Sequence, residues 1–320
     1  MRYLVTGGAG FIGSAIVGEL VRRGESVVVI DDLSTGKQRN LESVLDRVEF
    51  HHASITDLDA VQRAARGADF VIHLAARTSV PRSVQAPLET NTVNVEGTLK
   101  VLMAARDSGV RRLVYAGSSS AYGETPALPK IETMPAAPIS PYGVSKFTGE
   151  LYARVFTRVY GLETVTLRYF NVFGPRQEPG SPYSGVLARF MLALIRGEQP
   201  VIYGDGEQSR DFTYIDNVAD ATLSACTAAE VSGRVMNVAT GSRISLNQTL
   251  RFLERLAGCS AQARRDASRA GDILHSQADI RLARELLGYE PRVDFEEGLR
   301  RTWQWYLSEY SPAKRPPPAS

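Results

Sequence analysis

The sequence predicts an α/β protein in which a doubly wound parallel sheet is followed by a smaller C-terminal lobe. Short apolar runs recur at intervals of roughly 20 to 45 residues over the first half of the chain, and amphipathic stretches of helical length separate most of them. Strands and helices that alternate in this way form parallel sheets covered on both faces. From about residue 171 proline and glycine become frequent, which predicts the lobe.

The predicted elements follow one another along the first half of the chain. The strands cover residues 3–5, 27–30, 48–51, 70–73, 113–116 and 164–169. The clearest helical patterns between and after them cover residues 61–66, 94–108 and 146–160. In the second half, short helical pieces alternate with isolated strand-like runs through Tyr310.

The first predicted strand leads directly into a glycine turn. Gly7, Gly10 and Gly13 are spaced three apart and precede an amphipathic stretch that ends at Arg23. In such a strand–turn–helix unit the glycines permit a tight turn, close approach of the backbone to a pyrophosphate, and close packing of helix on strand. The free N–H groups of the helix N-terminus favour negative charge. The turn therefore predicts a dinucleotide site.

The second predicted strand ends in a carboxylate. Asp31 follows the apolar run at 27–30 and lies about 20 residues after the glycines. A carboxylate at this place suits the two hydroxyl groups of an adenosine ribose and repels the additional phosphate of NADP. We therefore expect NAD(H) as the cofactor.

Composition narrows the class of protein. The formal net charge is +2, from 37 basic and 35 acidic residues, so we expect no nucleic-acid partner. Cys226 and Cys259 are far apart without zinc-ligand spacing, so we expect neither a disulfide framework nor a metal site. No apolar run approaches the about 20 residues of a membrane span, and the sequence starts with a core strand, so we expect a cytoplasmic protein without a signal peptide or membrane contact.

The organisation follows from these patterns. We expect an NAD-binding domain at residues 1–170 and a lobe that is mainly for substrate at residues 171–310. The proline-rich residues 311–320 predict a disordered tail.

A second group of residues predicts chemistry at a hydroxyl group. Tyr142 and Lys146 are four residues apart at the start of a predicted helix, so their side chains emerge on one face. An adjacent ammonium favours the phenolate of a tyrosine, whose ordinary pKa is about 10. Ser118, Ser119 and Ser120 follow a predicted strand, at the sheet edge where catalytic groups are positioned. The pair alone also fits an exposed helix, and the serines a polar turn, but together with the glycine turn they favour a catalytic site.

Short segments along nearly the whole chain match one family pattern in order. They are TGGAGFIG at the glycine turn, DDLSTG from Asp31, HLAA at 73–76, NVEGT at 94–98, SSSAYG from Ser118, YGVSK from Tyr142, LRYFNVFGP from 167, DGEQSRDFTYIDN at 205–217 and RAGDILHSQAD at 269–279. With them the chain resembles an extended short-chain dehydrogenase/reductase of the NAD-dependent epimerase/dehydratase branch, up to about Tyr306. The resemblance implies a Rossmann domain with a substrate lobe.

The resemblance also implies a set of cofactor-binding residues for a tightly held NAD+. Asp31 would hold the adenosine ribose, and Tyr142 and Lys146 would meet the nicotinamide ribose. The other implied cofactor residues are Gly7, Gly10, Phe11, Ile12, Gly13, Asp32, Ser34, Gly36, Lys37, Ser54, Ile55, Leu74, Ala75, Ala76, Arg77, Asn94 and Phe170. Ser54 departs from the family pattern, which usually has an aspartate that bonds the adenine amino group. We expect weaker discrimination at adenine there.

The implied substrate is a nucleotide sugar. Asn171 would contact its diphosphate, which Arg210 and Arg269 would neutralise from the lobe. The other implied substrate residues are Ser79, Ser118, Ser119, Ser120, Tyr142, Val186, Leu187, Tyr203, Asp272 and Ser276. Ser276 takes the position at which a bulky aromatic residue excludes N-acetylated hexoses in related enzymes, so we expect both plain and N-acetylated hexoses to fit.

The branch shares one opening step, in which the tyrosine takes the proton of a sugar hydroxyl and NAD+ takes the hydride from the same carbon. Dehydratases resemble this chain but usually carry Asp-Glu after the catalytic Ser or Thr. Ser119 and Ser120 stand there instead and cannot act as acid or base near neutral pH, which also disfavours a decarboxylase. Residues 78–84 and 118–130 are most similar to bacterial UDP-hexose 4-epimerases. We expect interconversion of UDP-Glc with UDP-Gal, and of UDP-GlcNAc with UDP-GalNAc, through a 4-keto sugar.

Three alternatives stay open at this point. A UDP-glucuronate 4-epimerase needs no additional carboxylate and would use an arginine such as Arg82. A reductase would consume NADPH, which Asp31 disfavours. A binding module that senses NAD on the same fold would commonly lack the tyrosine or lysine, both of which are present.

The resemblance implies a homodimer, because enzymes of this kind usually pair through helices of the nucleotide domain. These would be the helices predicted at 94–108 and 146–160. Their apolar stripes also suit packing within one chain, so the sequence leaves the dimer as an expectation.

Overall fold

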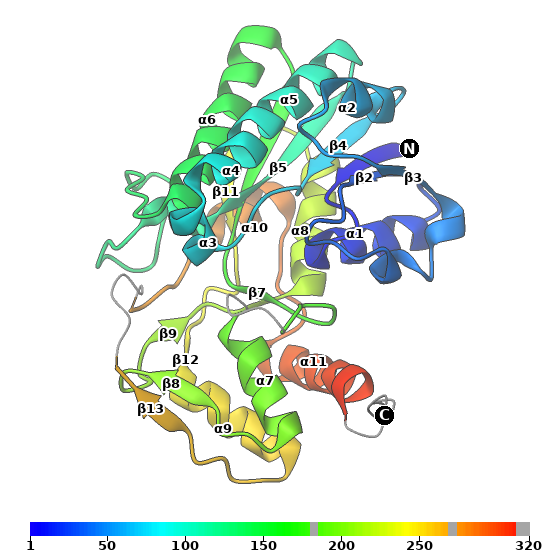
Figure 1. Cartoon of the computed structure of the whole chain (residues 1–320). Coiled ribbons are helices and arrows are strands. Elements are labelled where there is room, and N and C mark those ends of the chain that lie inside the picture. Colours follow the sequence, from blue (N-terminus) through cyan, green and yellow to red (C-terminus); the bar gives the residue numbers. More distant parts are fainter. Residues whose placement is uncertain (180–184, 268–273, 312–320) are drawn as a thin grey trace.

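In the computed structural model, which describes residues 1–179, 185–267 and 274–311, the main sheet has seven parallel strands in the order β11-β6-β5-β4-β1-β2-β3 (Figure 1). The strands are β1 (Arg2–Thr6), β2 (Ser26–Asp31), β3 (Val48–His52), β4 (Phe70–His73), β5 (Arg112–Ser118), β6 (Glu163–Tyr169) and β11 (Val235–Val238). The chain runs from β1 outward to β3 and then from β4 outward in the opposite direction, which confirms the predicted doubly wound fold.

Helices cover both faces of this sheet, and side chains alternate between the two. Val5 and Val29 point to one core, with α1 (Phe11–Arg22), α8 (Ile215–Thr227) and α10 (Arg281–Leu287). Leu4 and Val28 point to the other core, with α2 (Leu58–Ala65), α5 (Thr98–Asp107) and α6 (Pro141–Tyr160). The short helices α3 (Val80–Gln85) and α4 (Pro87–Asn91) and a π-helical turn, Thr92–Gly97, lead into α5.

The lobe lies beyond one end of the sheet and has its own core (Figure 1). Its elements are β7 (Val172–Phe173), α7 (Val186–Arg196), β8 (Val201–Tyr203), β9 (Ser209–Arg210), β10 (Thr213–Tyr214), β12 (Ile244–Ser245), α9 (Leu246–Ala257), β13 (Arg264–Asp266) and α11 (Phe295–Tyr310). Phe173 packs its ring against Phe212, Tyr214 and Phe295, at centroid distances of 5.4 to 6.2 Å within this aromatic cluster. The lobe is therefore held mainly by its aromatic core.

The chain returns to the main sheet after the lobe begins. β11 pairs with β6 along its full length, and α8 packs beside α1, although both follow residue 171. The division at residue 170 stays a prediction, and so does the disordered tail, because residues 312–320 lie outside the described part.

The predicted elements of the first half lie close to the observed ones. The pattern at 146–160 belongs to α6, which begins at Pro141 and is capped by Ser140, whose hydroxyl accepts from Gly143 N at 3.1 Å. Tyr142 therefore lies in the first turn of the helix, one turn before Lys146. In the described part of the chain, no helix is both long and apolar enough to span a membrane. The cytoplasmic location stays a prediction.

Candidate active site

The glycine turn leaves no room for side chains. Gly7 has φ +71°, and a Cβ there would lie 2.8 Å from the Ala75 Cα. A Cβ on Gly13 would lie 2.1 Å from the carbonyl oxygen of Gly7. No side chain caps the N-terminus of α1 among the described residues, so its first N–H groups stay available to an anion. Phe11 and Ile12 are the first residues of this helix.

Asp31 closes the next strand end. Its side chain is buried and accepts hydrogen bonds from Ala9 N at 2.9 Å and Leu33 N at 2.8 Å. Burial raises the pKa of this carboxyl, and the two N–H groups act in the opposite direction. A Cβ on Gly36 would lie 2.8 Å from one carboxylate oxygen, so the backbone of the following loop wraps closely around Asp31.

The loop residues predicted beside Asp31 are bound to one another. The Arg77 guanidinium contacts Ser34, lies 3.8 Å from the Asp32 carboxylate, and donates to Glu89 at 3.0 Å. Lys37 pairs with Glu178, from the loop that follows β7. If these side chains contact a dinucleotide, they must do so in addition to the hydrogen bonds and ion pairs that they already make with one another and with their neighbours.

The segment after β3 is also engaged locally. The Ser54 hydroxyl accepts from Thr56 N at 3.2 Å and lies 2.9 Å from the Thr56 hydroxyl, so a bond to adenine would compete with this turn. Ile55 is buried, and a Cβ on Gly97 would lie 2.7 Å from its Cδ1.

A buried histidine that sequence reasoning missed holds the end of β4. His73 bonds to the Thr6 hydroxyl at 2.7 Å through Nδ1 and to the Thr98 hydroxyl at 2.9 Å through Nε2. Burial, together with the charge of Lys146, lowers the pKa of His73 to about 3, so it is neutral. Thr6 also accepts from Leu74 N and Ala75 N, both at 3.2 Å. These bonds fix the segment of Leu74, Ala75 and Ala76 against the glycine turn.

Asn94 joins this segment to the catalytic helix. Its oxygen accepts from Arg77 N at 2.7 Å, and its amide donates to Arg77 O at 3.0 Å and to the Ser145 hydroxyl at 2.9 Å. Ser145 directly precedes Lys146 on α6. Asn94 therefore positions the β4 loop and α6 relative to each other, a role that its spacing in the sequence did not reveal.

Lys146 is a buried ammonium without an anionic partner. Its Nζ lies 4.4 Å from the centre of the Tyr115 ring, and it has no hydrogen bond or ion pair to the described residues. Burial lowers its pKa to about 7. The Tyr115 hydroxyl donates to Lys146 O at 3.1 Å and so holds this turn of α6.

Tyr142 lies against the serine segment. Burial raises the pKa of Tyr142, and its hydrogen bond with Ser118 acts in the opposite direction. This is opposite to the direction expected from the sequence, because burial disfavours the charged forms of both Tyr142 and Lys146. Ser118 also accepts from Ser120 N at 3.2 Å and from the Ser120 hydroxyl at 2.8 Å, whereas the Ser119 side chain makes no hydrogen bond to the described residues.

Two serines of α3 complete this corner. The Ser83 hydroxyl, which sequence reasoning missed, accepts from Tyr142 N at 3.1 Å. Ser79 caps α3 by accepting from Arg82 N at 3.2 Å. The bond to Ser83 therefore ties the first turn of α6 to α3.

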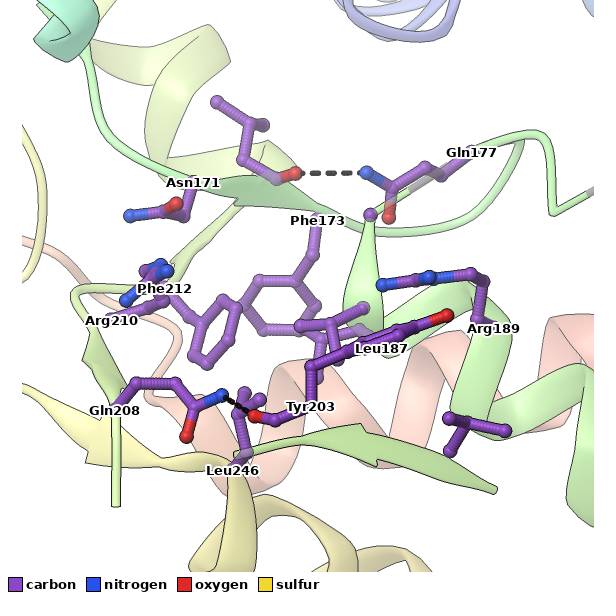
Figure 2. A pocket seen from close by; sticks show the side chains of 14 residues that line it. Asn171, Phe173, Gln177, Leu187, Arg189, Tyr203, Gln208, Arg210, Phe212 and Leu246 are labelled. Carbon is purple, nitrogen blue, oxygen red and sulfur yellow. Dashed lines mark hydrogen bonds between the residues drawn. The ribbon is translucent and has the colours of Figure 1, made fainter. Parts of the chain in front are cut away.

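The lobe contributes a separate cavity of about 330 Å³. Five residues predicted from the sequence to bind substrate line it together: Asn171, Val186, Leu187, Tyr203 and Arg210. Figure 2 shows Arg189 and Arg210 on opposite sides of this cavity, with Phe212 in its wall. Gln208 donates to Tyr203 O at 2.6 Å. Arg189, Gln208 and Phe212 were not predicted: no motif contains Arg189, and from the motif at 205–217, which contains Gln208 and Phe212, only Arg210 was assigned to the substrate.

Asn171 and Ser276 meet at the edge of this cavity. The Asn171 amide, on a backbone with φ +33°, donates to Asp211 O at 3.1 Å and to the Ser276 hydroxyl at 3.0 Å. Asp211 is fully buried and accepts from the backbone of Thr240, Gly241 and Ala278 at 2.9 to 3.1 Å. These bonds fix the wall that carries Ser276.

Phe170, which was predicted to face the nicotinamide, lies in the core of the main domain. Phe170 is fully buried, with its ring 6.1 Å from that of Tyr122. Arg269 and Asp272 lie outside the described residues. In the described ranges, no group of three or more His, Cys, Asp or Glu side chains could hold a metal ion.

The residues present fit a dinucleotide that runs from Asp31 across the glycine turn toward Lys146. The turn excludes side chains at Gly7 and Gly13, the helix N-terminus is uncapped, and Lys146 is a buried lysine without an anionic or hydrogen-bonding partner in the described part of the chain. Asp31 would hold the adenosine ribose, the turn the pyrophosphate, and Tyr142 and Lys146 the nicotinamide ribose.

Comparison with known proteins agrees with this geometry. The model of the NAD dependent epimerase/dehydratase family matches residues 3–239. A UDP-glucose 4-epimerase of Mycolicibacterium smegmatis is 40% identical over 97% of this chain and 99% of its own. A UDP-glucuronate 4-epimerase of Thermodesulfobacterium geofontis is 35% identical over 95% of each chain. The structure of a UDP-N-acetylglucosamine 4-epimerase of Methanobrevibacter ruminantium, in complex with UDP-N-acetylmuramic acid, matches with a TM-score of 0.93 and 39% identity, covering 96% of this chain and 98% of that one.

Proposed function

Because the chain belongs to the NAD-dependent epimerase/dehydratase family, we propose that it is a UDP-sugar 4-epimerase that interconverts UDP-Glc with UDP-Gal and UDP-GlcNAc with UDP-GalNAc. One observation carries the choice of reaction. Tyr142 lies beside Ser118, and the two residues that follow this serine, Ser119 and Ser120, are not carboxylates. The site thus has groups that move one proton at one hydroxyl, and no additional acid–base pair for dehydration.

NAD+, when bound, supplies a positively charged ring that accepts a hydride from the substrate and later gives the hydride back. Tyr142 would accept the proton of the sugar 4-hydroxyl and give it back at the same oxygen. Ser118, bonded to Tyr142, would share that proton with the sugar oxygen. Lys146 would hold the ribose hydroxyls and, once charged, stabilise the Tyr142 phenolate.

The lobe would hold the UDP part while the sugar changes its orientation. Arg210 and Tyr203 line the cavity, and an arginine fork suits the oxygens of a diphosphate. Epimerisation requires that the two faces of the 4-keto sugar be presented in turn, which a firm grip on the nucleotide and weak contacts to the sugar allow. The small Ser276 takes the position at which a bulky aromatic residue would exclude an N-acetyl group in related enzymes, which supports acceptance of acetylated substrates.

A UDP-glucuronate 4-epimerase is the second candidate, supported by the relative from Thermodesulfobacterium geofontis. Its carboxylate would need a cation beside the sugar. Arg82, the candidate from the sequence, donates to Glu89 at 3.1 Å, and Glu89 also pairs with Arg77. A uronate would have to compete with Glu89 for this arginine. We therefore propose UDP-hexoses as substrates in preference to UDP-uronates.

The test is turnover without added cofactor. Purified protein is incubated with UDP-galactose, with UDP-N-acetylgalactosamine and with UDP-galacturonate, and products are separated by chromatography. We expect the C4 epimers of the first two, with no net change in nicotinamide absorbance. A net absorbance change would indicate a reductase, and turnover of the uronate alone would favour the second candidate.

We also propose that the protein pairs as a homodimer through α6 and its neighbour α5. Val144, Leu151, Val155 and Val159 are 43 to 63% exposed and recur on one face of α6. Leu88 of the adjacent α4 is 83% exposed. Leu151→Glu with Val155→Glu should yield a monomer in analytical ultracentrifugation, whereas Leu307→Glu, on exposed α11, should leave the dimer. A native chain that sediments as a monomer would contradict this proposal.

A further inference from the structure

Asn237 lies on the edge strand of the main sheet, and the proposed chemistry does not use it. It belongs to β11 and is fully buried. Its side-chain oxygen accepts from the Tyr122 hydroxyl at 2.7 Å, and its amide donates to Lys130 O at 3.0 Å and to Asp279 O at 3.2 Å. Both amide hydrogens and the carbonyl oxygen of this side chain are thus bound to protein.

The first of these partners, Tyr122, lies close in sequence to Ser118, which is proposed to share the transferred proton. Tyr122 ends the short 3-10 helix Ser119–Tyr122, which directly follows Ser118. The Arg168 guanidinium lies 4.6 Å from the centre of its ring and makes two bonds to Glu150 of α6, at 2.9 and 2.7 Å. Tyr122 is therefore connected both to the serine that contacts Tyr142 and to the helix that carries Tyr142.

The other two partners belong to the wall that carries Ser276. Lys130 N donates to Gln277 O at 2.7 Å, and Asp279 N donates to Lys130 O at 2.8 Å, in a short parallel bridge. Ser276 directly precedes Gln277 and accepts from Asn171. Asn237 therefore joins the segment that follows Ser118 to the segment that follows Ser276 through one buried side chain.

We propose that Asn237 and Tyr122 are positioning residues that set the distance between the proton-transfer groups and the wall at Ser276, and so determine the preference between acetylated and plain hexoses. This inference rests on the proposed function. An N-acetylated sugar must place its 4-hydroxyl at Tyr142 and its 2-acetamido group at Ser276 at the same time. A plain hexose needs only the first contact, so the acetylated substrate depends more on this distance.

Tyr122→Phe tests the inference, because it removes one hydroxyl and keeps the ring. We expect the ratio of kcat/KM for UDP-GalNAc to that for UDP-Gal to fall about 5-fold, since a buried acceptor is left unpaired and the wall is released. The fall should come mainly from KM of the acetylated substrate.

Tyr169→Phe is the matched control. Its hydroxyl is also buried and bonds to the Thr222 hydroxyl at 2.7 Å, but it faces α8. It should lower the melting temperature by a similar amount and change the ratio less than about 2-fold. Asn237→Ala, which removes all three bonds, should shift the ratio in the same direction as Tyr122→Phe, and circular dichroism shows whether it folds.

Equal loss on both substrates in Tyr122→Phe, or the same ratio as in Tyr169→Phe, would overturn the inference and leave the epimerase proposal standing. A wild-type protein that neither turns over these sugars nor binds them in calorimetry would overturn both. If Asn237→Ala does not fold, Tyr122→Phe alone decides.

Discussion

The ends of the main-sheet strands and the lobe form their halves of the site in different ways. In the main domain, Thr6, His73 and Asn94 are buried, and each has two or more bonds to neighbouring segments. In the lobe, strands of two or three residues and one face of α7 surround an open cavity whose wall is aromatic and cationic. The cofactor position is thus fixed by the fold, whereas under the proposed function side chains of the lobe that can be exchanged singly would decide which nucleotide sugar fits.

Tyr142→Phe should have the largest effect, because it removes the proposed proton-transfer group from the main domain. We expect kcat to fall about 1,000-fold, with little change in the affinity for UDP, which we propose that the lobe holds. Steady-state kinetics and calorimetry measure the two quantities. Tyr160→Phe, at the exposed end of α6, should retain full activity. Turnover at the wild-type rate in Tyr142→Phe would rule out this role.

Lys146→Met should show how much the buried lysine, which the proposed function requires, destabilises the main domain. The pKa of Lys146 in the folded protein is about 7, below that of an unfolded lysine, so burial of the ammonium destabilises the fold below about pH 7. As pH rises from about 7 toward 10.5, the folded lysine is already neutral and the wild-type protein recovers stability. Cofactor-free Lys146→Met should thus be more stable than wild type by on the order of 3 kcal/mol at pH 6, and the gain should shrink by pH 10. Urea denaturation at both pH values measures it, and a gain that does not change with pH would contradict the buried cation.

Arg210→Ala should affect the lobe alone. Losing a charge-assisted contact to the diphosphate should raise KM about 10- to 50-fold with a much smaller change in kcat. Arg251→Ala, an exposed arginine of α9 outside the cavity, serves as the control in the same assay. A selective loss of kcat in Arg210→Ala would mean that the lobe takes part in the chemistry and would weaken the contrast between the two halves.

Ser276→Tyr should have the smallest effect and act on one class of substrate. It should lower kcat/KM for UDP-GlcNAc about 10-fold and leave UDP-Glc nearly unchanged. Ser276→Ala loses the hydrogen bond from Asn171 but keeps a small side chain. This variant therefore distinguishes the effect of side-chain size from the effect of the lost hydrogen bond. Full activity of Ser276→Tyr on the acetylated substrate would refute the role of this position.

The same contrast explains what could be predicted from the sequence. The glycine turn, Asp31 and the pair of Tyr142 and Lys146 are local patterns, in which spacing along one strand or helix already determines geometry. β11 was not predicted, because its four residues lie far from β6 in the sequence and its pattern is too short to identify a strand.

Contacts between segments that are far apart in the sequence could not be predicted either. Asn171 meets Ser276 across 105 positions, and Tyr122 meets Asn237 across 115, so only the folded chain reveals them. The direction of the Tyr142 pKa was wrong for a related reason. Spacing shows that a lysine is near, but it does not show how deeply both groups are buried.

The most direct test of the account follows one hydrogen atom. UDP-galactose that carries deuterium at C4 is incubated with the protein, without added cofactor, until the epimers equilibrate, and the products are analysed by NMR and mass spectrometry. We predict that UDP-glucose forms with its deuterium still at C4, because the hydrogen that leaves this carbon returns to it. Loss of the label to solvent, its appearance at another carbon, or a product that is reduced or dehydrated would contradict the proposed 4-epimerase.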